Sequence, residues 1–471
     1  MVIIAPKKYS KPLKPLIQHK NAHGIKTKFY SLQSISTLFN GRDLQEKIKH
    51  FIKFALENWQ TKYVLLVGDV NEIPVRYLWN EDYGRFVFPD RYYSDLYYAD
   101  IFDKHGNYVS WDSNNNNKFG EWWHNGRDQL DLHPDVYLGR LPCRNIFEVK
   151  NIVKKIINYE TNTHKQPWFK KILVTGGDWI GETPGLNDAD FLAEEVAKMM
   201  ENKGFKAVRL YASLHNLTTK NIHTAINSGV GFIFFAPGDG LRTKWSTFIN
   251  ESNPVEFSVP NIKLLNNHEK LPIVVVGGCM ANDIDPRGGY PTPLQQGECW
   301  GWTFVKKRNG GAIATVGSTG GCFYRNTSDF FALLEKTFFE TYCKENITHL
   351  GELWGKTISN YLNISPVRWN NGETEPDGMN CKDIQMFSLI GDPSLRIGGY
   401  LHHDNPQKTK QINYTSTTKK TKQPYNVNEK KCEKEKHVET EITKTIKNHP
   451  PLNTHPPIYI EGNKDFTTEN G

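Results

Sequence analysis

The pattern of apolar and polar positions alternates between strand-like and helix-like segments over the first 160 residues. Short unbroken apolar runs, VIIAP from Val2 and KYVLLVGD from Lys62, are typical of strands that are buried on both faces of a sheet. Between them, LQEKIKHFIKFALENW places its apolar residues at helical spacing. Strand, helix and strand in this order predict a parallel sheet with right-handed crossovers.

The same alternation returns between residues 164 and 400. The runs KKILVTGGD, VGFIFFAPGDG and LPIVVVGGCM each predict a buried strand that ends in a glycine-rich turn, and NDADFLAEEVAKMMENKGF predicts a helix closed by Gly204. The sequence therefore predicts an α/β protein built of two units, residues 1–163 and 164–400. Each unit is expected to have a mostly parallel sheet flanked by helices.

The periodicity stops after residue 400. Residues 401–455 are rich in Lys, Thr and Asn and have no apolar period, which is typical of a disordered, solvated linker. Residues 456–471 regain aromatic residues and predict the start of a further module that is cut short. The first strand begins at Val2 without a signal peptide. The abrupt first strand and the incomplete last module together predict that the chain is one piece of a longer surface or secreted protein.

Composition narrows the classes of function. The 58 Lys and Arg residues exceed the 51 Asp and Glu residues by a net charge of only +7, and no basic stripe with interleaved aromatics favours nucleic acid as a partner. No apolar run reaches the roughly 18 residues that a transmembrane helix needs. The seven cysteines are scattered and form no CxxC motif, so neither a zinc ribbon nor a dithiol redox motif is predicted.

Cys279 is the cysteine in the most suggestive position. It follows PIVVVGG, so its thiol is expected at the carboxyl end of a buried strand, where functional groups of α/β sheets gather. A thiolate there could attack a carbonyl carbon while nearby backbone N–H groups stabilise the oxyanion. A small buried hydrophobic side chain is the alternative interpretation. The turn Gly238-Asp239-Gly240 ends the preceding buried strand and is expected beside Cys279.

Several segments, taken together and in order from Val2 to Gly399, resemble the gingipain family of cysteine peptidases. They are VIIAPKKYSKPLKPLIQHKNAHGIKT, YVLLVGDVNEIPVRY, SDLYYAD, PDVYLGRLP, INSGVGFIFFAPGDG, VVVGGCM, GGAIATVGST and FSLIGDPSLRIG. The resemblance implies a caspase-like fold, cysteine peptidase activity on protein or peptide substrates, no required cofactor, and an extracellular or cell-surface location.

The resemblance also implies roles for individual residues. In this family a Gly-His-Gly turn supplies the catalytic histidine, and a cysteine after the next buried strand is the nucleophile. Cys279 matches the nucleophile, and Asp178 matches an acidic residue that orients the histidine. Asp239, however, stands where the family has histidine.

Substrate-binding positions follow from the same resemblance. Arginine-specific members hold the basic side chain of the substrate with an Asp early in the helix that follows, which matches Asp188 or Asp190 here. An Asp that caps this helix is the alternative. Tyr324 matches an aromatic residue that lines the pocket, and a core tyrosine is the alternative.

The replacement of histidine by Asp239 leaves two functions open. Imidazole serves a thiol both as a base and as a cation, whereas an ionised carboxylate nearby raises the pKa of the thiol. Three substitutes are conceivable: a histidine from elsewhere, an Asp with a strongly raised pKa, or a water-mediated route. The nearest histidines in sequence are His215, His223 and His268. The chain is thus either a peptidase with a non-standard Asp239, or a catalytically inactive pseudopeptidase that acts as a binding or scaffold module of a larger exported protein.

The loop WDSNNNNKFGEWW is a second candidate site. Asp112, Asn114 and Asn116 place oxygen donors at alternate positions and Glu121 follows, which resembles a calcium loop and predicts a structural calcium ion. The loop lacks the central glycine of an EF-hand, and an Asn-rich surface turn is the alternative.

Overall fold

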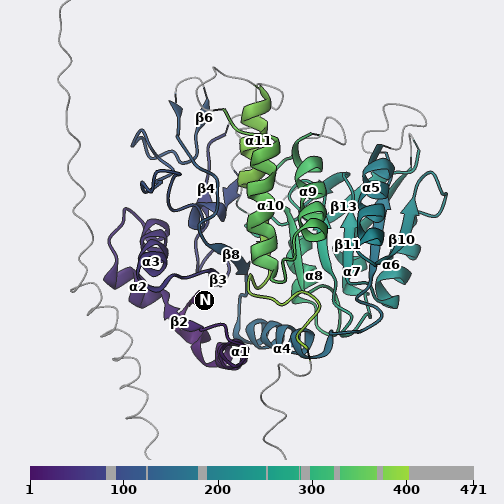
Figure 1. Cartoon of the computed structure of the whole chain (residues 1–471), viewed down its shortest axis with the longest axis horizontal. Helices are drawn as coiled ribbons and strands as arrows, with labels where there is room; N and C mark the ends of the chain where they lie inside the picture. The colour runs from purple at the N-terminus through teal and green to yellow at the C-terminus, as the bar shows by residue number, and fades with distance from the viewer. Residues whose placement is uncertain are drawn as a thin grey trace, which may run out of the picture. The chain divides into compact units, whose positions relative to one another are not determined.

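The chain folds around one extended sheet in this computed structural model (Figure 1). The structure describes residues 1–80, 92–123, 126–178, 188–250, 253–285, 287, 297–322, 329–368 and 375–401. In the sheet, ten strands follow the order β10-β9-β11-β15-β16-β17-β8-β3-β1-β2. The prediction of an α/β fold with mostly parallel strands is confirmed.

The first 163 residues supply one side of this sheet. Its strands are β1 (Val2–Ala5), β2 (Lys28–Ser31), β3 (Tyr63–Val67) and β8 (Tyr137–Leu141). The helices of this part are α1 (Ser10–Ala22), α2 (Leu32–Leu38), α3 (Leu44–Trp59) and α4 (Ile146–Asn162), with short 3-10 turns at Lys7–Tyr9 and Leu96–Tyr98. Short two-residue strands, β4 (Arg76–Tyr77) with β5 (Tyr93–Ser94) and β6 (Trp122–Trp123) with β7 (Gly126–Arg127), pair within the segment between β3 and β8.

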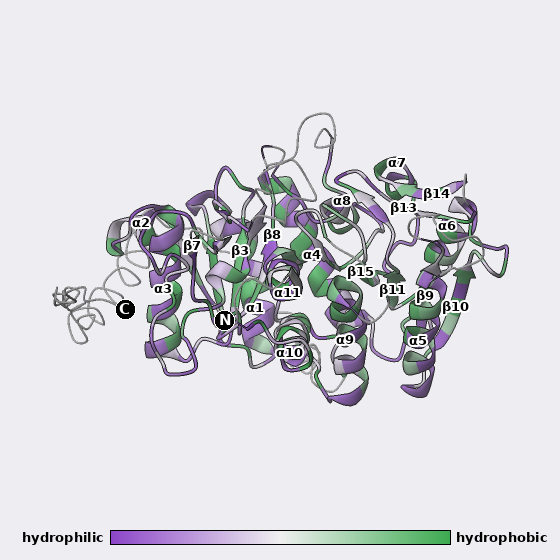
Figure 2. Cartoon of the chain, turned by 90° about the horizontal axis from the view of Figure 1, so that it is seen from above, coloured by the Kyte–Doolittle hydropathy of each residue, from purple (hydrophilic) through white to green (hydrophobic). Residues whose placement is uncertain are grey.

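Later residues supply the other side of the sheet. Its strands are β9 (Lys171–Gly176), β10 (Lys206–Tyr211), β11 (Phe232–Phe235), β15 (Ile273–Val276), β16 (Ala314–Ser318) and β17 (Phe387–Ile390). The helices are α5 (Asp188–Asn202), α6 (Thr219–Ser228), α7 (Val259–Lys263), α8 (Trp300–Lys306), α9 (Phe330–Lys344), α10 (Leu350–Ile364) and α11 (Glu375–Met386). Seen from above, α5, α9 and α10 line one face of the sheet, and α7 and α8 lie on the other (Figure 2).

The direction of the strands changes once, between β16 and β17. These two strands are antiparallel, whereas every other neighbouring pair in the sheet is parallel. The carboxyl ends of β11 and β15 therefore lie at one edge of the sheet, and the carboxyl end of β3, which precedes Asp69, lies at the opposite edge. Cys279 and Asp69 consequently belong to different edges.

A small antiparallel sheet covers the edge that carries Cys279. It consists of β12 (Asp239–Leu241), β13 (Lys244–Phe248) and β14 (Pro254–Ser258). Aromatic packing fixes it: the ring of Phe235 lies 4.9 Å from that of Trp245 and 5.2 Å from that of Trp300, all fully buried. The indole N–H of Trp245 also donates to the carbonyl of Ala236 at 3.1 Å. Asp239 is therefore held beside the ends of β11 and β15.

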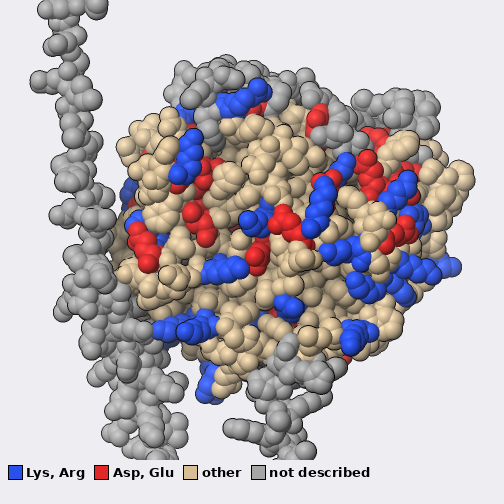
Figure 3. Space-filling model, in the orientation of Figure 1, with Lys and Arg blue, Asp and Glu red and all other residues tan. Residues whose placement is uncertain are grey.

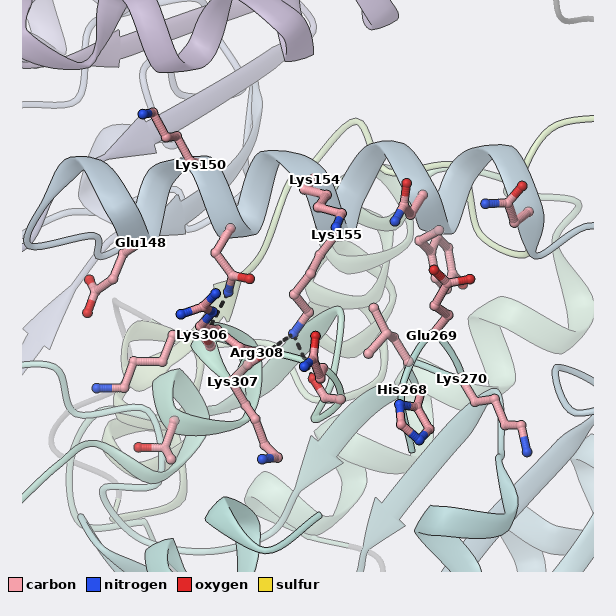
Figure 4. Close-up of a pocket in the computed structure, with 18 of the residues that line it drawn as sticks. Glu148, Lys150, Lys154, Lys155, His268, Glu269, Lys270, Lys306, Lys307 and Arg308 are labelled. Carbon is pink, nitrogen blue, oxygen red and sulfur yellow. Dashed lines mark hydrogen bonds between the residues drawn. The ribbon is translucent and has the colours of Figure 1, made fainter. Parts of the chain in front are cut away.

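Helix α4 is tied to the C-terminal half by a buried lysine. The ammonium of Lys155 lies 2.6–3.1 Å from the carbonyl oxygens of Val305, Lys307, Gly310 and Ala312. Figure 4 shows this side chain reaching from α4 toward the loop of Lys307 and Arg308. The contact joins the two sets of strands on the side where β15 and β16 begin.

The surface charges are mixed in sign. On the face drawn in Figure 3, Lys and Arg side chains alternate with Asp and Glu over most of the surface. Many of them form exposed pairs, such as Lys53 with Glu57, which contribute little to stability. Among the described residues, none of the helices combines the length and the apolar character that a membrane span requires.

Candidate active site

Cys279 lies in a tight turn just after β15. The N–H of Met280 donates to the carbonyl of Gly320 at 2.9 Å, and the N–H of Asn282 donates to that of Ser318 at 2.8 Å. These bonds tie the turn to the end of β16. Met280 has φ +55°, a left-handed conformation that costs a non-glycine residue about 1–2 kcal/mol. The strained turn leaves the thiol of Cys279 partly exposed.

Gly240 lies against the backbone of Cys279. A Cβ atom added to Gly240 would come 2.3 Å from the Cys279 nitrogen and 2.6 Å from its carbonyl oxygen, so only glycine fits. Gly238 is just as confined, because a Cβ atom there would lie 2.4 Å from the carbonyl oxygen of Ser246. Its N–H donates to the carbonyl of Gly277 at 2.8 Å. The two glycines thus bring the turn that holds Asp239 next to Cys279.

Asp239 is an exposed residue on β12, paired with Ser246 of β13. Partial burial of its carboxyl group raises its pKa, against the effect of Lys244, and Glu256 raises it further. The negative charge of Asp239 in turn raises the pKa of the Cys279 thiol. Asp239 therefore acts on the thiol in the opposite sense to an imidazolium.

A second cysteine compensates for part of this effect. The Sγ atom of Cys322 lies 3.7 Å from that of Cys279, and its thiol donates a hydrogen bond to the Cys279 sulfur. This hydrogen bond is the main reason why the pKa of Cys279 is lowered, in spite of burial and of Asp239. Burial and the neighbouring Cys279 raise the pKa of Cys322 well above its usual range. The hydrogen bond from Cys322 thus favours the thiolate at Cys279, and the Cys279 thiol, when protonated, can donate to the carbonyl of Cys322 at 3.7 Å.

Cys322 was not singled out from the sequence. The signal that could have found it is its place in AIATVGSTGGC, where it follows the strand next to β15 and a glycine-rich turn, just as Cys279 follows its own. The carboxyl ends of two adjacent parallel strands place both cysteines at one edge.

Buried ionisable groups lie beneath this pair. Glu335 of α9 is almost fully buried, and neither of its carboxyl oxygens has a hydrogen-bond partner among the described residues. It lies against Gly277, where an added Cβ atom would come 2.8 Å from its Oε2. Burial, with a contribution from Asp383, raises the pKa of Glu335 well above its usual range. The buried Lys382 of α11 lies close enough to lower the pKa of Cys279.

Asp178, the other residue with a predicted catalytic carboxylate, joins β9 to the small sheet through its backbone. Its N–H and carbonyl pair with the backbone of Phe248, both at 2.9 Å, which joins the end of β9 to β13. Neither Asp178 nor any histidine forms a hydrogen bond with Cys279 within the described part of the chain. His268 precedes β15 and therefore lies toward the opposite edge of the sheet, and His223 of α6 contacts Asn227.

The predicted substrate-binding residues Asp188 and Asp190 lie at the start of α5. Asp188 accepts a hydrogen bond from the N–H of Ala189 at 2.9 Å. Asp190 is buried and accepts one from the N–H of Ser213 at 3.0 Å, and burial raises its pKa. Both contacts fasten local backbone, and neither residue hydrogen-bonds to Cys279. Tyr324 lies outside the described residues.

In the predicted calcium loop, the carboxylates of Asp112 and Glu121 accept hydrogen bonds from other side chains of the protein. The side-chain amides of Asn114 and Asn116 donate to Glu121 at 2.9 and 2.6 Å, and Arg42 donates to Asp112 at 2.5 Å. Within the described residues, no group of three or more His, Cys, Asp or Glu side chains is placed to hold a metal ion. Calcium would have to replace these amide and guanidinium contacts, so the calcium site stays a prediction.

A cavity of about 1220 Å³ lies away from Cys279, between α4 and the loop that follows α8. Figure 4 shows Lys306, Lys307 and Arg308 on one side of it and His268 and Lys270 on another. It opens where β15 begins, whereas Cys279 follows the end of that strand. The cavity is therefore separate from the candidate active site.

The family model of peptidase family C25 matches residues 1–398. The chain belongs to peptidase family C25. Among its relatives, gingipain R2 of Porphyromonas gingivalis is 24% identical over 287 residues, which is 60% of this chain and 32% of that protein. Lys-gingipain of the same species is 23% identical over 193 residues, which is 40% of this chain and 10% of that protein. This C25 chain thus spans a third or less of the length of these relatives.

Solved structures agree with this membership at the level of the fold. The crystal structure of the Arg-specific cysteine proteinase gingipain R superposes with a TM-score of 0.62 at 21% identity and covers 84% of this chain and 78% of that one. A complex of the pro- and mature domains of Porphyromonas gingivalis RgpB gives the same score and identity, with 84% and 79% covered. The C25 chain therefore has the gingipain fold.

Proposed function

We propose that this C25 chain is a cysteine-type peptidase in which Cys279 is the nucleophile and the Cys322 thiol stabilises its thiolate in place of an imidazolium. The observation that carries the proposal is the hydrogen bond between the two sulfur atoms, 3.7 Å long, at the carboxyl edge of β15 and β16. The thiolate, rather than the thiol, is the attacking species, so a donor that stabilises it raises its population at neutral pH.

The oxyanion of the reaction has donors beside Cys279. Neither the N–H of Gly278 nor that of Cys279 has an acceptor among the described residues. When the Cys279 thiolate attacks a peptide carbonyl, the carbonyl oxygen gains the negative charge, and such free N–H groups stabilise it. The tetrahedral intermediate then collapses to a thioester as the C–N bond breaks.

Asp239 is the group next to Cys279 that can carry the proton. Its carboxylic acid form donates a proton to the leaving amine, and partial burial raises the pKa of this carboxyl group. Its carboxylate then accepts a proton from the water that hydrolyses the thioester.

A pseudopeptidase is the second candidate, and one observation favours it. No histidine hydrogen-bonds to Cys279 within the described part of the chain, and by the resemblance Asp239 would replace the family's histidine. Loss of a catalytic base costs several orders of magnitude in rate. In that case the same sheet edge serves to bind peptides, as a binding or scaffold module.

Four full-length proteins separate the candidates: the wild type, Asp239→His, Cys279→Ala and the control Cys343→Ala. Each is assayed on a panel of fluorogenic peptides and with a thiol-directed peptidase probe. The peptidase proposal expects cleavage by the wild type and by Cys343→Ala, and none by Cys279→Ala. Cleavage by Asp239→His alone would instead support the pseudopeptidase.

A further inference from the structure

The two cysteines at the candidate active site form an asymmetric pair. Cys279 is partly exposed, and Cys322 is buried, with 6% of its surface exposed. Their sulfur atoms lie 3.7 Å apart, which is contact distance for two thiols. Among the described residues, Cys279 is therefore the more accessible of the two thiols.

The backbone holds the turns that carry Cys279 and Cys322 next to each other. β15 and β16 are parallel neighbours with Val276 opposite Gly317, so the turns that follow them lie side by side. The hydrogen bond from Met280 to Gly320 links these turns directly. A disulfide needs a sulfur–sulfur distance of about 2.05 Å. Formation of a disulfide therefore needs the two sulfur atoms to approach by about 1.7 Å from their 3.7 Å contact.

We propose that Cys279 and Cys322 are a reversible oxidation site, in which a hydroperoxide converts the two thiols into a disulfide. The proposal goes beyond peptide cleavage and depends only on the placement of the two sulfurs. In a peptidase the disulfide removes the nucleophile, and in a pseudopeptidase it reshapes the peptide-binding edge.

The chemistry takes two steps. The Cys279 thiolate attacks one oxygen of the hydroperoxide, the O–O bond breaks, and a sulfenic acid forms while water or an alcohol leaves. Cys322 then loses its proton and attacks the Cys279 sulfur; the S–O bond breaks, the S–S bond forms, and water leaves. The two thiols lose two electrons in total, and the hydroperoxide accepts them.

The surroundings fit these roles. The hydrogen bond from Cys322 favours the thiolate at Cys279, which is the species that reacts with peroxides. Burial and the neighbouring Cys279 raise the pKa of Cys322 well above its usual range, so Cys322 keeps its proton until it attacks. A nearby second thiol also protects Cys279, because a sulfenic acid that meets no thiol is oxidised irreversibly to a sulfinic acid.

Mass spectrometry of the full chain tests the proposal. After treatment with a small excess of hydrogen peroxide, the wild type should lose the mass of two hydrogen atoms and yield one cross-linked peptide pair containing Cys279 and Cys322. Dithiothreitol should reverse both changes. The control Cys343→Ala should behave like the wild type. Oxygen addition at Cys279 without this cross-link, or a cross-link to another cysteine, would overturn the proposal.

Two variants of Cys322 complete the design. In Cys322→Ser and Cys322→Ala, peroxide should add oxygen to Cys279, and dimedone should trap the sulfenic acid. Circular dichroism establishes that each variant is folded. If neither folds, the peptide map of the wild type still decides the question. The readout is mass rather than cleavage, so the two proposals can fail separately. A chain that forms the disulfide but cleaves no peptide would contradict the peptidase proposal and support the oxidation site.

Discussion

The backbone of Gly240 lies directly against the backbone of Cys279, so that no side chain fits between them. This contact makes the position of Cys279 depend on a residue that follows a different strand. It also places Asp239, the residue before Gly240, beside Cys279.

Gly240→Ala tests this contact. The new Cβ atom would lie 2.3 Å from the nitrogen of Cys279, so the turn must move, at a cost of roughly 1–3 kcal/mol. The melting temperature should fall and the rate of Cys279 alkylation should change. Gly204→Ala is the control, because its Cβ atom meets no atom within 4 Å. That variant has an unfavourable φ of +84° and should lose stability without altering alkylation. Equal alkylation in Gly240→Ala and the wild type would contradict the contact.

Asp239→Asn tests the charge beside the thiol. Ionised Asp239 raises the pKa of Cys279, so removal of the charge should lower that pKa. The pH dependence of alkylation by iodoacetamide, read at Cys279 by peptide mapping, gives the pKa directly. Asp188→Asn, which removes a carboxylate that does not hydrogen-bond to Cys279, should leave the curve in place. An unmoved curve in Asp239→Asn would rule out the proposed interaction.

Cys322→Ala tests the donor to the thiolate. The hydrogen bond from Cys322 is the largest cause of the lowered pKa of Cys279, so its loss should raise that pKa and slow alkylation near neutral pH. Cys322→Ser retains an O–H donor and should restore part of the effect. If both variants titrate like the wild type, the sulfur–sulfur hydrogen bond does not stabilise the thiolate.

Glu335→Gln tests the buried carboxyl group under the site. Its pKa in the folded chain lies well above the ordinary value of 4.5. The folded state therefore holds a proton that the unfolded chain releases, so stability is full below pH 4.5 and falls as the pH rises toward the folded pKa. Glutamine cannot ionise, so the variant should lose less stability between acid and neutral pH. Glu340→Gln on the same helix, where the glutamate is paired with Lys344, should retain the slope of the wild type. Parallel slopes in Glu335→Gln and the wild type would contradict this assignment.

The calcium hypothesis predicts a rise in melting temperature when calcium is added, because a ligand that binds only the folded state stabilises it. Glu121→Gln should abolish that rise. Magnesium serves as the control, since it prefers a stricter octahedral site. If the melting temperature does not change when calcium is added, the calcium hypothesis is wrong. The loop is then an Asn-rich turn held by its amide hydrogen bonds.

Much of the fold was predictable because its strands are short, wholly apolar and closed by glycine-rich turns. The run IVVV of β15 and the turn before Cys279 have both signals. The reversal at β17 was not predictable, because FSLI is brief and alternates only weakly, and its partners come from distant parts of the chain. The local sequence pattern predicts that successive strands run parallel. It does not predict which strands will lie beside a strand that comes late in the chain, such as β17.

The candidate site was also predictable only in part. Cys279 and Asp239 stand at strand ends that the sequence displays, and the structure brings them together through Gly240. Glu335 could not be found, because in FFALLEKTFF a single acid is expected on the exposed face of an amphipathic helix. Helix α9 instead lies between α10 on one side and α5 on the other and faces the sheet, and its Glu335 is buried (Figure 2).

The most direct test of the central claim is the rate of peptide hydrolysis by the full-length chain as a function of pH, measured beside Cys279→Ala. The account predicts cleavage by the wild type over part of this pH range, and none by Cys279→Ala at any pH. Equal rates for the two proteins, or no cleavage by the wild type at any pH, would contradict the claim that Cys279 is a working nucleophile.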